Sequence, residues 1–220
     1  MTQISLDPLD LAALLCSRVC HDVISPVGAI ANGLEMLEDE KDPEMRAMAL
    51  DLVKKSSAKA SAQLQFCRLA FGAAGSAGAD IDSGDAQNVA NGLLVDDRTK
   101  IEWNVARAYM PKNKVKLLLN MCLIASKAIP RGGLLTVTVT GTGNETSARI
   151  EAAGPNLRLA HGVAQMLSGA PDGPVDAHSI QPYYAALVAK AAGMQVSART
   201  ENDKVVLEAL PLAEDLALAS

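Results

Sequence analysis

Two Asp-Pro pairs divide the N-terminal part of the chain into two long helical segments, and this pattern restricts the fold most strongly. Asp7-Pro8 and Asp42-Pro43 each combine a helix-capping residue with a proline that fits the first helical turn. The pattern predicts one helix from Asp7-Pro8 to about Glu38 and another from Asp42-Pro43 to Phe71-Gly72. Because a short polar turn joins them, we expect an antiparallel hairpin.

Each predicted helix has an apolar stripe at steps of three and four residues. On the first helix the stripe, which we expect to be its buried face, comprises Ala12, Leu15, Val19, Val23, Val27, Ile30, Leu34 and Leu37. On the second helix it is rich in small residues and comprises Met45, Met48, Ala49, Leu52, Val53, Ser56, Ala60, Gln63, Leu64, Cys67 and Ala70. A lone hairpin cannot bury both stripes, so we expect a homodimer in which two hairpins form a four-helix bundle.

His21 is predicted to face solvent from the first helix. At 3.6 residues per turn it lies about 200° from Val19 and Val23, which belong to the apolar stripe. Asp22 follows it directly, and Pro26 comes five residues later. Pro26 lacks a backbone N–H, so it removes the helical bond to the Asp22 carbonyl and bends the backbone beside His21.

A stretch rich in glycine and alanine, residues 72–79, predicts a flexible linker and a domain boundary. We therefore place a hairpin domain at 1–72, a linker at 73–84 and a second domain at 85–220. In the second domain we expect helices at about 85–95, 111–129, 157–167 and 179–192, and strands at about 100–105, 134–140, 147–151, 194–200 and 204–210. This order predicts an α/β sandwich, with helices on one face of a mixed sheet.

Charge and composition exclude several classes of function. A net charge of −5 and a pI near 5.2 argue against nucleic-acid binding, which needs clustered Lys and Arg. The four cysteines and three histidines lack the spacings of a metal site. The apolar runs are too short for a membrane span, and the first residues lack the pattern of a secretory signal. We therefore expect a cytoplasmic protein that binds neither metal nor membrane.

The segment His21-Asp22-Val23-Ile24-Ser25-Pro26 resembles the phospho-acceptor box of sensor histidine kinases. It shares the histidine, the acid, the small hydroxyl residue and the proline, whereas Ile24 stands where kinases usually have arginine. A hairpin followed by a helix–strand domain also resembles the kinase core. The resemblance implies that His21 accepts a phosphoryl group and that Ser25 and Pro26 shape its surroundings.

The second domain resembles a kinase ATP-binding domain in its order of elements, but its nucleotide-binding chemistry is altered. Residues 117–133 resemble the asparagine box, with Asn120, Ala125 and Lys127 in register. Ile124 occupies the place of the asparagine that holds magnesium, and an isoleucine offers no oxygen ligand.

Two further kinase boxes also depart from their pattern. Ala152 replaces the aspartate that reads adenine, and Glu151, one residue early, would point to the other face of its strand. Tyr183 stands in the region of the glycine-rich phosphate loop, where bulky side chains prevent backbone amides from closing on phosphates. We therefore expect no ATP binding and no bound cofactor.

A chain with an intact histidine box and an altered nucleotide domain resembles the ChpT family of bacterial histidine phosphotransferases. The resemblance implies that His21 takes a phosphoryl group from the receiver aspartate of a hybrid histidine kinase and passes it to response-regulator receiver domains that control the cell cycle. Asp22 would orient the imidazole, and the receiver would supply magnesium. Contacts with the receiver are assigned to Arg18, Lys55, Lys59 and Gln63, the last two being placed beside His21 by the hairpin.

Two other classes of function remain open from the sequence. An active ATP-dependent histidine kinase would label itself with ATP in the absence of any receiver. A non-enzymatic dimeric scaffold would gather receivers on the hairpin and would not need His21. For each lysine near His21, the alternative is an ordinary solvated helix face.

Overall fold

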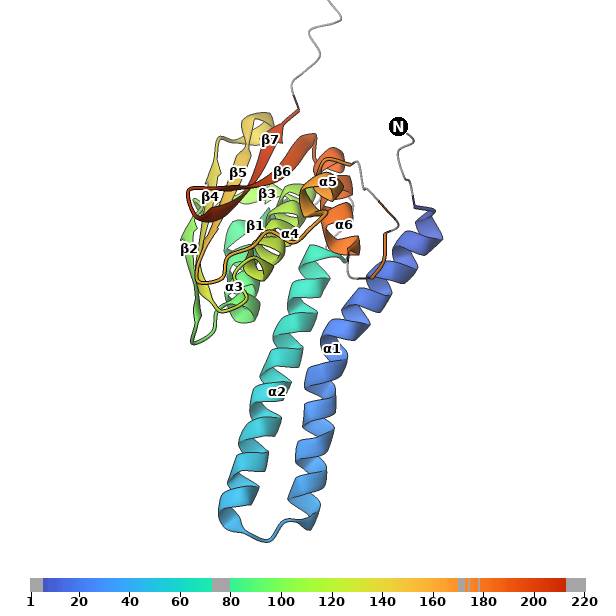
Figure 1. The fold of residues 1–220 in the computed structure, drawn as a ribbon, viewed down its shortest axis with the longest axis vertical. Helices are drawn as coiled ribbons and strands as arrows, with labels where there is room; N and C mark the ends of the chain where they lie inside the picture. The colour runs from blue at the N-terminus through green and yellow to red at the C-terminus, as the bar shows by residue number, and fades with distance from the viewer. Residues whose placement is uncertain (1–5, 73–79, 170–172, 174, 178, 213–220) are drawn as a thin grey trace, which may run out of the picture.

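The computed structural model describes residues 6–72, 80–169, 173, 175–177 and 179–212. Helices α1 (Pro8–Asp39) and α2 (Pro43–Ala70) form the predicted antiparallel hairpin (Figure 1). Both predicted caps are present: the Asp7 carboxylate accepts from the Leu9 amide, and the Asp42 carboxylate accepts from the amides of Glu44 and Met45. Helix α1 continues through Pro26, which lies inside it.

The two helices approach closely where the chain lacks a side chain. A Cβ atom added at Gly33 would lie 2.6 Å from Val53 Cγ2 and 3.3 Å from the Ala49 carbonyl oxygen. Gly33 and Pro26 are the residues of α1 that are fully buried. A small residue at position 33 therefore allows α2 to pack directly against α1.

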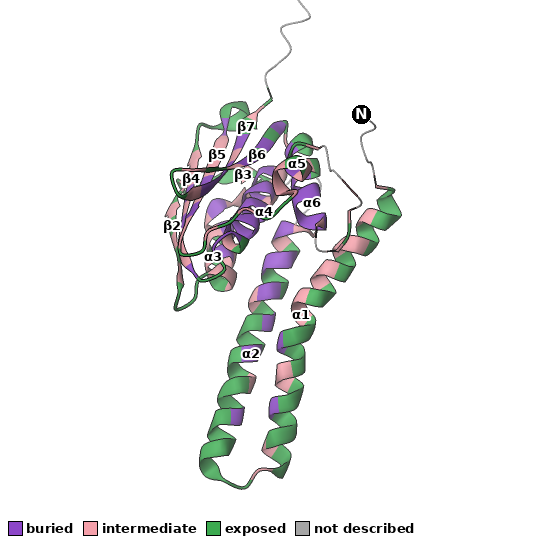
Figure 2. Cartoon of the chain, in the orientation of Figure 1, coloured by how far each residue is buried: buried purple, intermediate pink, exposed green. Residues whose placement is uncertain are grey.

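The expectation that the apolar stripe of α1 is its buried face is wrong for a single chain. Val27 and Leu34 are each 49% exposed, because α2 packs beside the stripe and does not cover it. Figure 2 shows that most of α1 and the outer side of α2 are exposed.

Among the described residues, α1 also has the length and apolar composition of a helix that could cross a membrane, although composition alone is weak support for a span.

The remaining described residues form a five-stranded mixed sheet with helices packed on one face (Figure 1). Its order is β2-β4-β5-β7-β6, and only the β2–β4 pair is parallel. The strands are β2 (Thr99–Asn104), β4 (Gly133–Thr140), β5 (Ser147–Ala153), β6 (Met194–Glu201) and β7 (Lys204–Pro211). The helices are α3 (Ser83–Leu94), α4 (Lys112–Lys127), α5 (Val163–Leu167) and α6 (Ile180–Ala191), with a 3-10 turn at Gly143–Glu145. The predicted α/β sandwich is confirmed.

Two details differ from the sequence-based expectation. The helix predicted at 157–167 begins only at Val163, because Gly162 before it has a left-handed backbone with φ of 79°. Two short strands, β1 (Asp80–Asp82) and β3 (Tyr109–Pro111), pair antiparallel and were not predicted. Strand β1 and the start of α3 occupy the last part of the predicted linker 73–84, and residues 73–79 lie outside the described residues.

Helix α4 connects the sheet to the hairpin. On one side, Leu118 and Cys122 pack in the core formed with the sheet and α6. On another side, Leu119 packs with Phe66 of α2 in a second core that also contains α3. The Asn120 side-chain amide donates to the Ala70 carbonyl oxygen at 3.1 Å, so α4 also holds the last turn of α2.

Candidate functional site

His21 lies on the solvent side of α1, as predicted, with 71% of its side chain exposed. The next residue, Asp22, turns back toward the protein and is only 18% exposed. Arg18, one turn earlier, donates from Nε to Asp22 Oδ2 at 2.8 Å. His21 Nδ1 and Asp22 Oδ1 are 3.5 Å apart. An exposed imidazole therefore stands next to a carboxylate that is itself fixed by an arginine.

Arg18 was predicted to contact a receiver near His21, and its bond to Asp22 was not predicted. The i, i+4 spacing of Arg18 and Asp22 is the signal that would have found this pair. The Arg18 side chain is only 12% exposed, because it lies against its neighbours and not in solvent. The structure thus gives Arg18 a direct role in holding Asp22, whereas its contact with a receiver stays a prediction.

The other residues predicted to surround His21 differ in how far they are exposed. Ser25 is exposed on the next turn of α1, whereas Pro26 is buried. On α2, Lys59 is exposed, and Lys55 is exposed and bonded to Asp51 at 2.7 Å. These lysines remain accessible to a partner protein.

The structure corrects the placement of Gln63. Its side chain was predicted to face a partner beside His21, but it is buried and donates from Nε2 to Cys67 Sγ at 3.6 Å. The sequence assigned Gln63 both to the apolar stripe of the second helix and to the receiver contacts, and its burial agrees with the stripe. Pairing across a turn estimates the height of a residue along a hairpin, whereas its orientation depends on how the helices pack.

The three altered nucleotide-binding positions of the second domain are all packed into its interior. Ile124 and Tyr183 are 5% exposed, and Ala152 is fully buried. The Tyr183 hydroxyl accepts from the Leu6 amide at 3.1 Å, which connects α6 to the start of the hairpin. Within the described ranges no cluster of His, Cys, Asp or Glu could hold a metal ion.

Glu151 lies on the opposite face of the sheet from Ala152, as the strand pattern predicted. Its carboxylate accepts from Arg149 Nη2 at 2.9 Å and from Lys204 Nζ at 3.1 Å. These bonds hold the pKa of Glu151 below its usual value. Glu151 is therefore part of a charged network on the outer face and does not replace the missing aspartate.

Lys127, the last residue of α4, lies within electrostatic reach of the histidine site. Burial lowers the pKa of Lys127 to about 8, with a further lowering by Arg18 and an opposing effect of Asp22. The second domain thus places the Lys127 ammonium, on a residue that is still exposed to solvent, near the Arg18–Asp22 pair.

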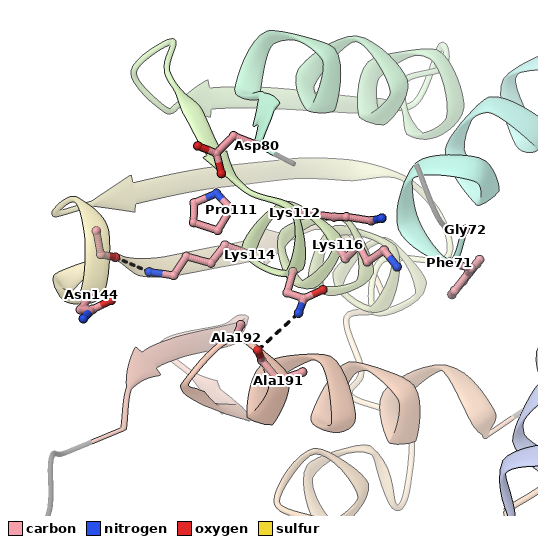
Figure 3. A pocket seen from close by; sticks show the side chains of 12 residues that line it. Phe71, Gly72, Asp80, Pro111, Lys112, Lys114, Lys116, Asn144, Ala191 and Ala192 are labelled. Atoms are coloured by element: carbon pink, nitrogen blue, oxygen red, sulfur yellow. Dashed lines mark hydrogen bonds between the residues drawn. The ribbon is translucent and has the colours of Figure 1, made fainter. Parts of the chain in front are cut away.

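A cavity of about 640 Å³ lies at the N-terminal end of α4, the end away from Lys127 (Figure 3). Lys112, Lys114 and Lys116 line it, and Lys114 Nζ donates to the Gly143 carbonyl oxygen. Because α4 has 16 residues, this end is about 22 Å from Lys127. The cavity has no lining residue from α1, so it is separate from the histidine site.

Comparison with known proteins identifies the family. The pattern of the histidine phosphotransferase C-terminal domain matches residues 83–204. The protein phosphotransferase ChpT of Brucella abortus (strain 2308) is 52% identical over 207 residues, which cover 94% of this chain and 98% of that protein. The chain belongs to the ChpT-type histidine phosphotransferases.

A solved phosphotransferase structure agrees with this assignment. A bacterial phosphotransferase structure at 1.7 Å matches with a TM-score of 0.86 and 48% identity, over 95% of this chain and all of that one. The histidine kinase AdeS of Acinetobacter baumannii is more distant, with a TM-score of 0.45 and 11% identity over 88% of this chain and 98% of that one. The predicted family, fold class and phosphotransferase activity in a phosphorelay are therefore confirmed.

Proposed function

We propose that His21 is the residue that carries the phosphoryl group in this ChpT-type phosphotransferase. It would take the group from the receiver aspartate of a hybrid histidine kinase and pass it to receiver domains of response regulators that control the cell cycle. The observation that carries the proposal is the exposed His21 ring beside Asp22, whose carboxylate is fixed by Arg18.

The chemistry requires a neutral imidazole nitrogen whose lone pair can attack phosphorus. That nitrogen attacks the phosphorus of the acyl phosphate, so an N–P bond forms while the P–O bond to the receiver aspartate breaks. The aspartate leaves as a carboxylate. Delivery to the next receiver is the reverse reaction, with a carboxylate oxygen as nucleophile, so we expect transfer to be reversible.

Asp22 selects which nitrogen reacts in this proposal. Its Oδ1 atom faces His21 Nδ1, and a carboxylate there favours the tautomer with the proton on Nδ1. Nε2 then carries the lone pair and serves as the nucleophile. As Nε2 becomes phosphorylated the ring gains positive charge, and the carboxylate stabilises that charge.

The receiver completes the site. Magnesium and a lysine of the receiver would stabilise the transferring group, so this chain would bind no cofactor. Lys55 and Lys59 remain exposed on α2 to contact the acidic surface around a receiver's aspartate. The domain division at 1–72, 73–84 and 85–220 would let the hairpin carry the histidine while the second domain adds to receiver docking.

The protein would act as a homodimer in the cytoplasm. Most of the large apolar side chains described as exposed lie on α1 and α2, including Val27, Leu34 and Leu64. Leu64 also lines an apolar groove of about 550 Å³ between the two helices, together with Leu15 and Val19. A second hairpin would cover this groove and the stripe of α1 in a four-helix bundle.

The test is transfer from a purified, pre-phosphorylated receiver domain in the presence of magnesium and the absence of ATP. We expect wild-type chain to become labelled and His21→Ala to stay unlabelled. Asn32→Ala, an exposed change on the same helix, should behave as wild type. Labelling of His21→Ala at the wild-type rate would show that another residue carries the group.

A second assay separates the relay from an autokinase. Radiolabelled ATP without any receiver should leave the wild-type chain unlabelled. Labelling of His21 under these conditions would instead show an active ATP-dependent histidine kinase.

A further inference from the structure

A cavity of about 410 Å³ lies in the second domain between α4, α5 and α6. Its walls are largely apolar and include Ile124 of α4, Leu159 of the segment before α5, and Met166 of α5. Ile124 in its wall offers no oxygen ligand for magnesium, so the lining does not favour a magnesium-bound triphosphate.

Two polar side chains meet in this cavity. Lys127 Nζ donates to Gln181 Oε1 at 2.9 Å, which fixes the orientation of the Gln181 amide. The Gln181 side chain is buried, with only 1% of the residue exposed, and its Nε2 atom has no hydrogen-bond acceptor among the described residues. A buried N–H donor without an acceptor is unfavourable, and native structures rarely retain one without a reason.

Lys127 is an exposed residue and can donate to a ligand as well as to Gln181. Its ammonium group has three donors, of which the amide oxygen of Gln181 takes one. Burial disfavours its charged form and lowers its pKa to about 8. An anion placed against Nζ would reverse that effect, because a nearby negative charge favours the charged form of lysine.

The other ionisable groups that line the cavity, Asp176 and His161, leave Lys127 and Gln181 available to a ligand. The Asp176 carboxylate is used at the start of α6, where Oδ1 accepts from the Ser179 amide at 2.8 Å and from its hydroxyl at 2.7 Å. His161 lines the cavity from the segment before α5. Lys127 is therefore the cation that acts with the unpaired Gln181 amide.

We propose that this cavity binds a small organic monocarboxylate, with one carboxylate oxygen accepting from Lys127 Nζ and the other from Gln181 Nε2. The two donors sit side by side because the Gln181 amide is bonded to Lys127 through its oxygen. One lysine cation balances one negative charge, which favours a monocarboxylate over a phosphate dianion or a triphosphate. The apolar walls then accommodate an aliphatic body.

Hexanoate is a suitable probe, measured by isothermal titration calorimetry on the full chain. We expect saturable binding of hexanoate, and at least 10-fold weaker binding of hexan-1-ol, which has the same body without the carboxylate. Inorganic phosphate and ATP should also bind at least 10-fold more weakly. Affinity for hexanoate should fall as the pH rises above about 8, because Lys127 then loses its proton in the unliganded chain.

Two variants assign the binding to the cavity. Lys127→Met and Gln181→Leu keep side-chain volume but remove the charge and the amide donor, and each should weaken hexanoate binding at least 10-fold. Lys100→Met, an exposed lysine on β2, is the matched control and should bind as wild type. Circular dichroism establishes that each variant is folded. If Lys127→Met does not fold, Gln181→Leu still decides the test.

Three results would overturn the proposal. Absence of saturable hexanoate binding to the folded wild-type chain would show that the cavity holds no carboxylate. Equal affinity in the wild type and in a folded Lys127→Met or Gln181→Leu variant would place the ligand elsewhere. Tighter binding of ATP or inorganic phosphate than of hexanoate would show that the site has kept a phosphate specificity.

Discussion

The proposed phosphotransfer site depends on two successive contacts between side chains of α1. Arg18 fixes one oxygen of Asp22, and the other oxygen faces His21. The arginine matters because a single carboxylate next to an exposed ring would otherwise rotate freely. An i, i+4 pair on a helix supplies this restraint at low entropic cost, since the backbone already places both side chains together.

We predict that Asp22→Asn slows phosphoryl transfer without weakening receiver binding. A hydrogen bond to a charged group is worth about 1.5–3 kcal/mol, which corresponds to roughly a 10- to 100-fold change in rate. The measurement is the single-turnover transfer rate over a range of receiver concentrations. The rate at saturation should fall while the half-saturating concentration stays unchanged.

Arg18→Met should give a smaller loss of the same kind, because Asp22 keeps its charge but loses its fixed position. Glu38→Gln removes a carboxylate near the end of α1 and serves as the control.

If Asp22→Asn transfers at the wild-type saturating rate, the Asp22 carboxylate has no orienting role. A changed half-saturating concentration alone would instead assign Asp22 to receiver contact.

At the level of secondary structure, the hairpin and α4 show two different ways in which helices meet. Gly33 permits direct contact between α1 and α2, whereas α4 is buried on nearly all sides by the sheet, α2 and α3. The almost continuous apolar run of α4 is what a fully buried helix requires. The hairpin, in contrast, leaves large apolar side chains of both helices exposed in the single chain, among them Val27 and Leu34 of α1 and Leu64 of α2.

We predict that Gly33→Val destabilises the hairpin. The added Cβ would meet Val53 Cγ2 at 2.6 Å, so the helices would have to separate. Overpacking of this kind typically costs about 1–3 kcal/mol. Urea denaturation followed by circular dichroism should show a lower midpoint for the variant.

Gly28→Ala is the matched control on the same helix. A Cβ added at Gly28 would have no neighbour within 4 Å, and alanine favours a helix over glycine by about 1 kcal/mol. This variant should be as stable as wild type or more stable. Equal destabilisation by both changes would show that close packing at position 33 is not the cause.

For the whole molecule, the exposed apolar surface of the hairpin predicts self-association. Val27 and Leu34 are each 49% exposed in the single chain, and both lie on the stripe that the sequence marked as buried. The second domain does not cover this stripe. A second copy would bury it without disturbing His21, which faces away from the stripe.

We predict that Leu34→Glu converts a dimer into a monomer. A charge in the centre of an apolar bundle is unfavourable, whereas the same residue is tolerated on an exposed face of the single chain. Light scattering coupled to size-exclusion chromatography should report half the wild-type mass. Leu187→Glu, a change at an exposed leucine of α6, should leave the mass unchanged.

Two outcomes would contradict the dimer. A wild-type chain that elutes with the mass of one copy at micromolar concentration would remove the proposal. An unchanged mass for folded Leu34→Glu would show that the copies associate through another surface.

Local sequence patterns were enough to predict the hairpin, the outward direction of His21 and the departures from the kinase nucleotide boxes at Ile124, Ala152 and Tyr183. Helix caps, the 3.6-residue period and single missing side chains are local properties, and they hold whatever the rest of the chain does. The folded structure was needed to show which of the two assignments of Gln63 holds, that α5 is short, that β1 pairs with β3 and that Lys127 meets Gln181. Apart from the shortening of α5 at Gly162, these features depend on how elements pack against one another, which local periodicity cannot specify.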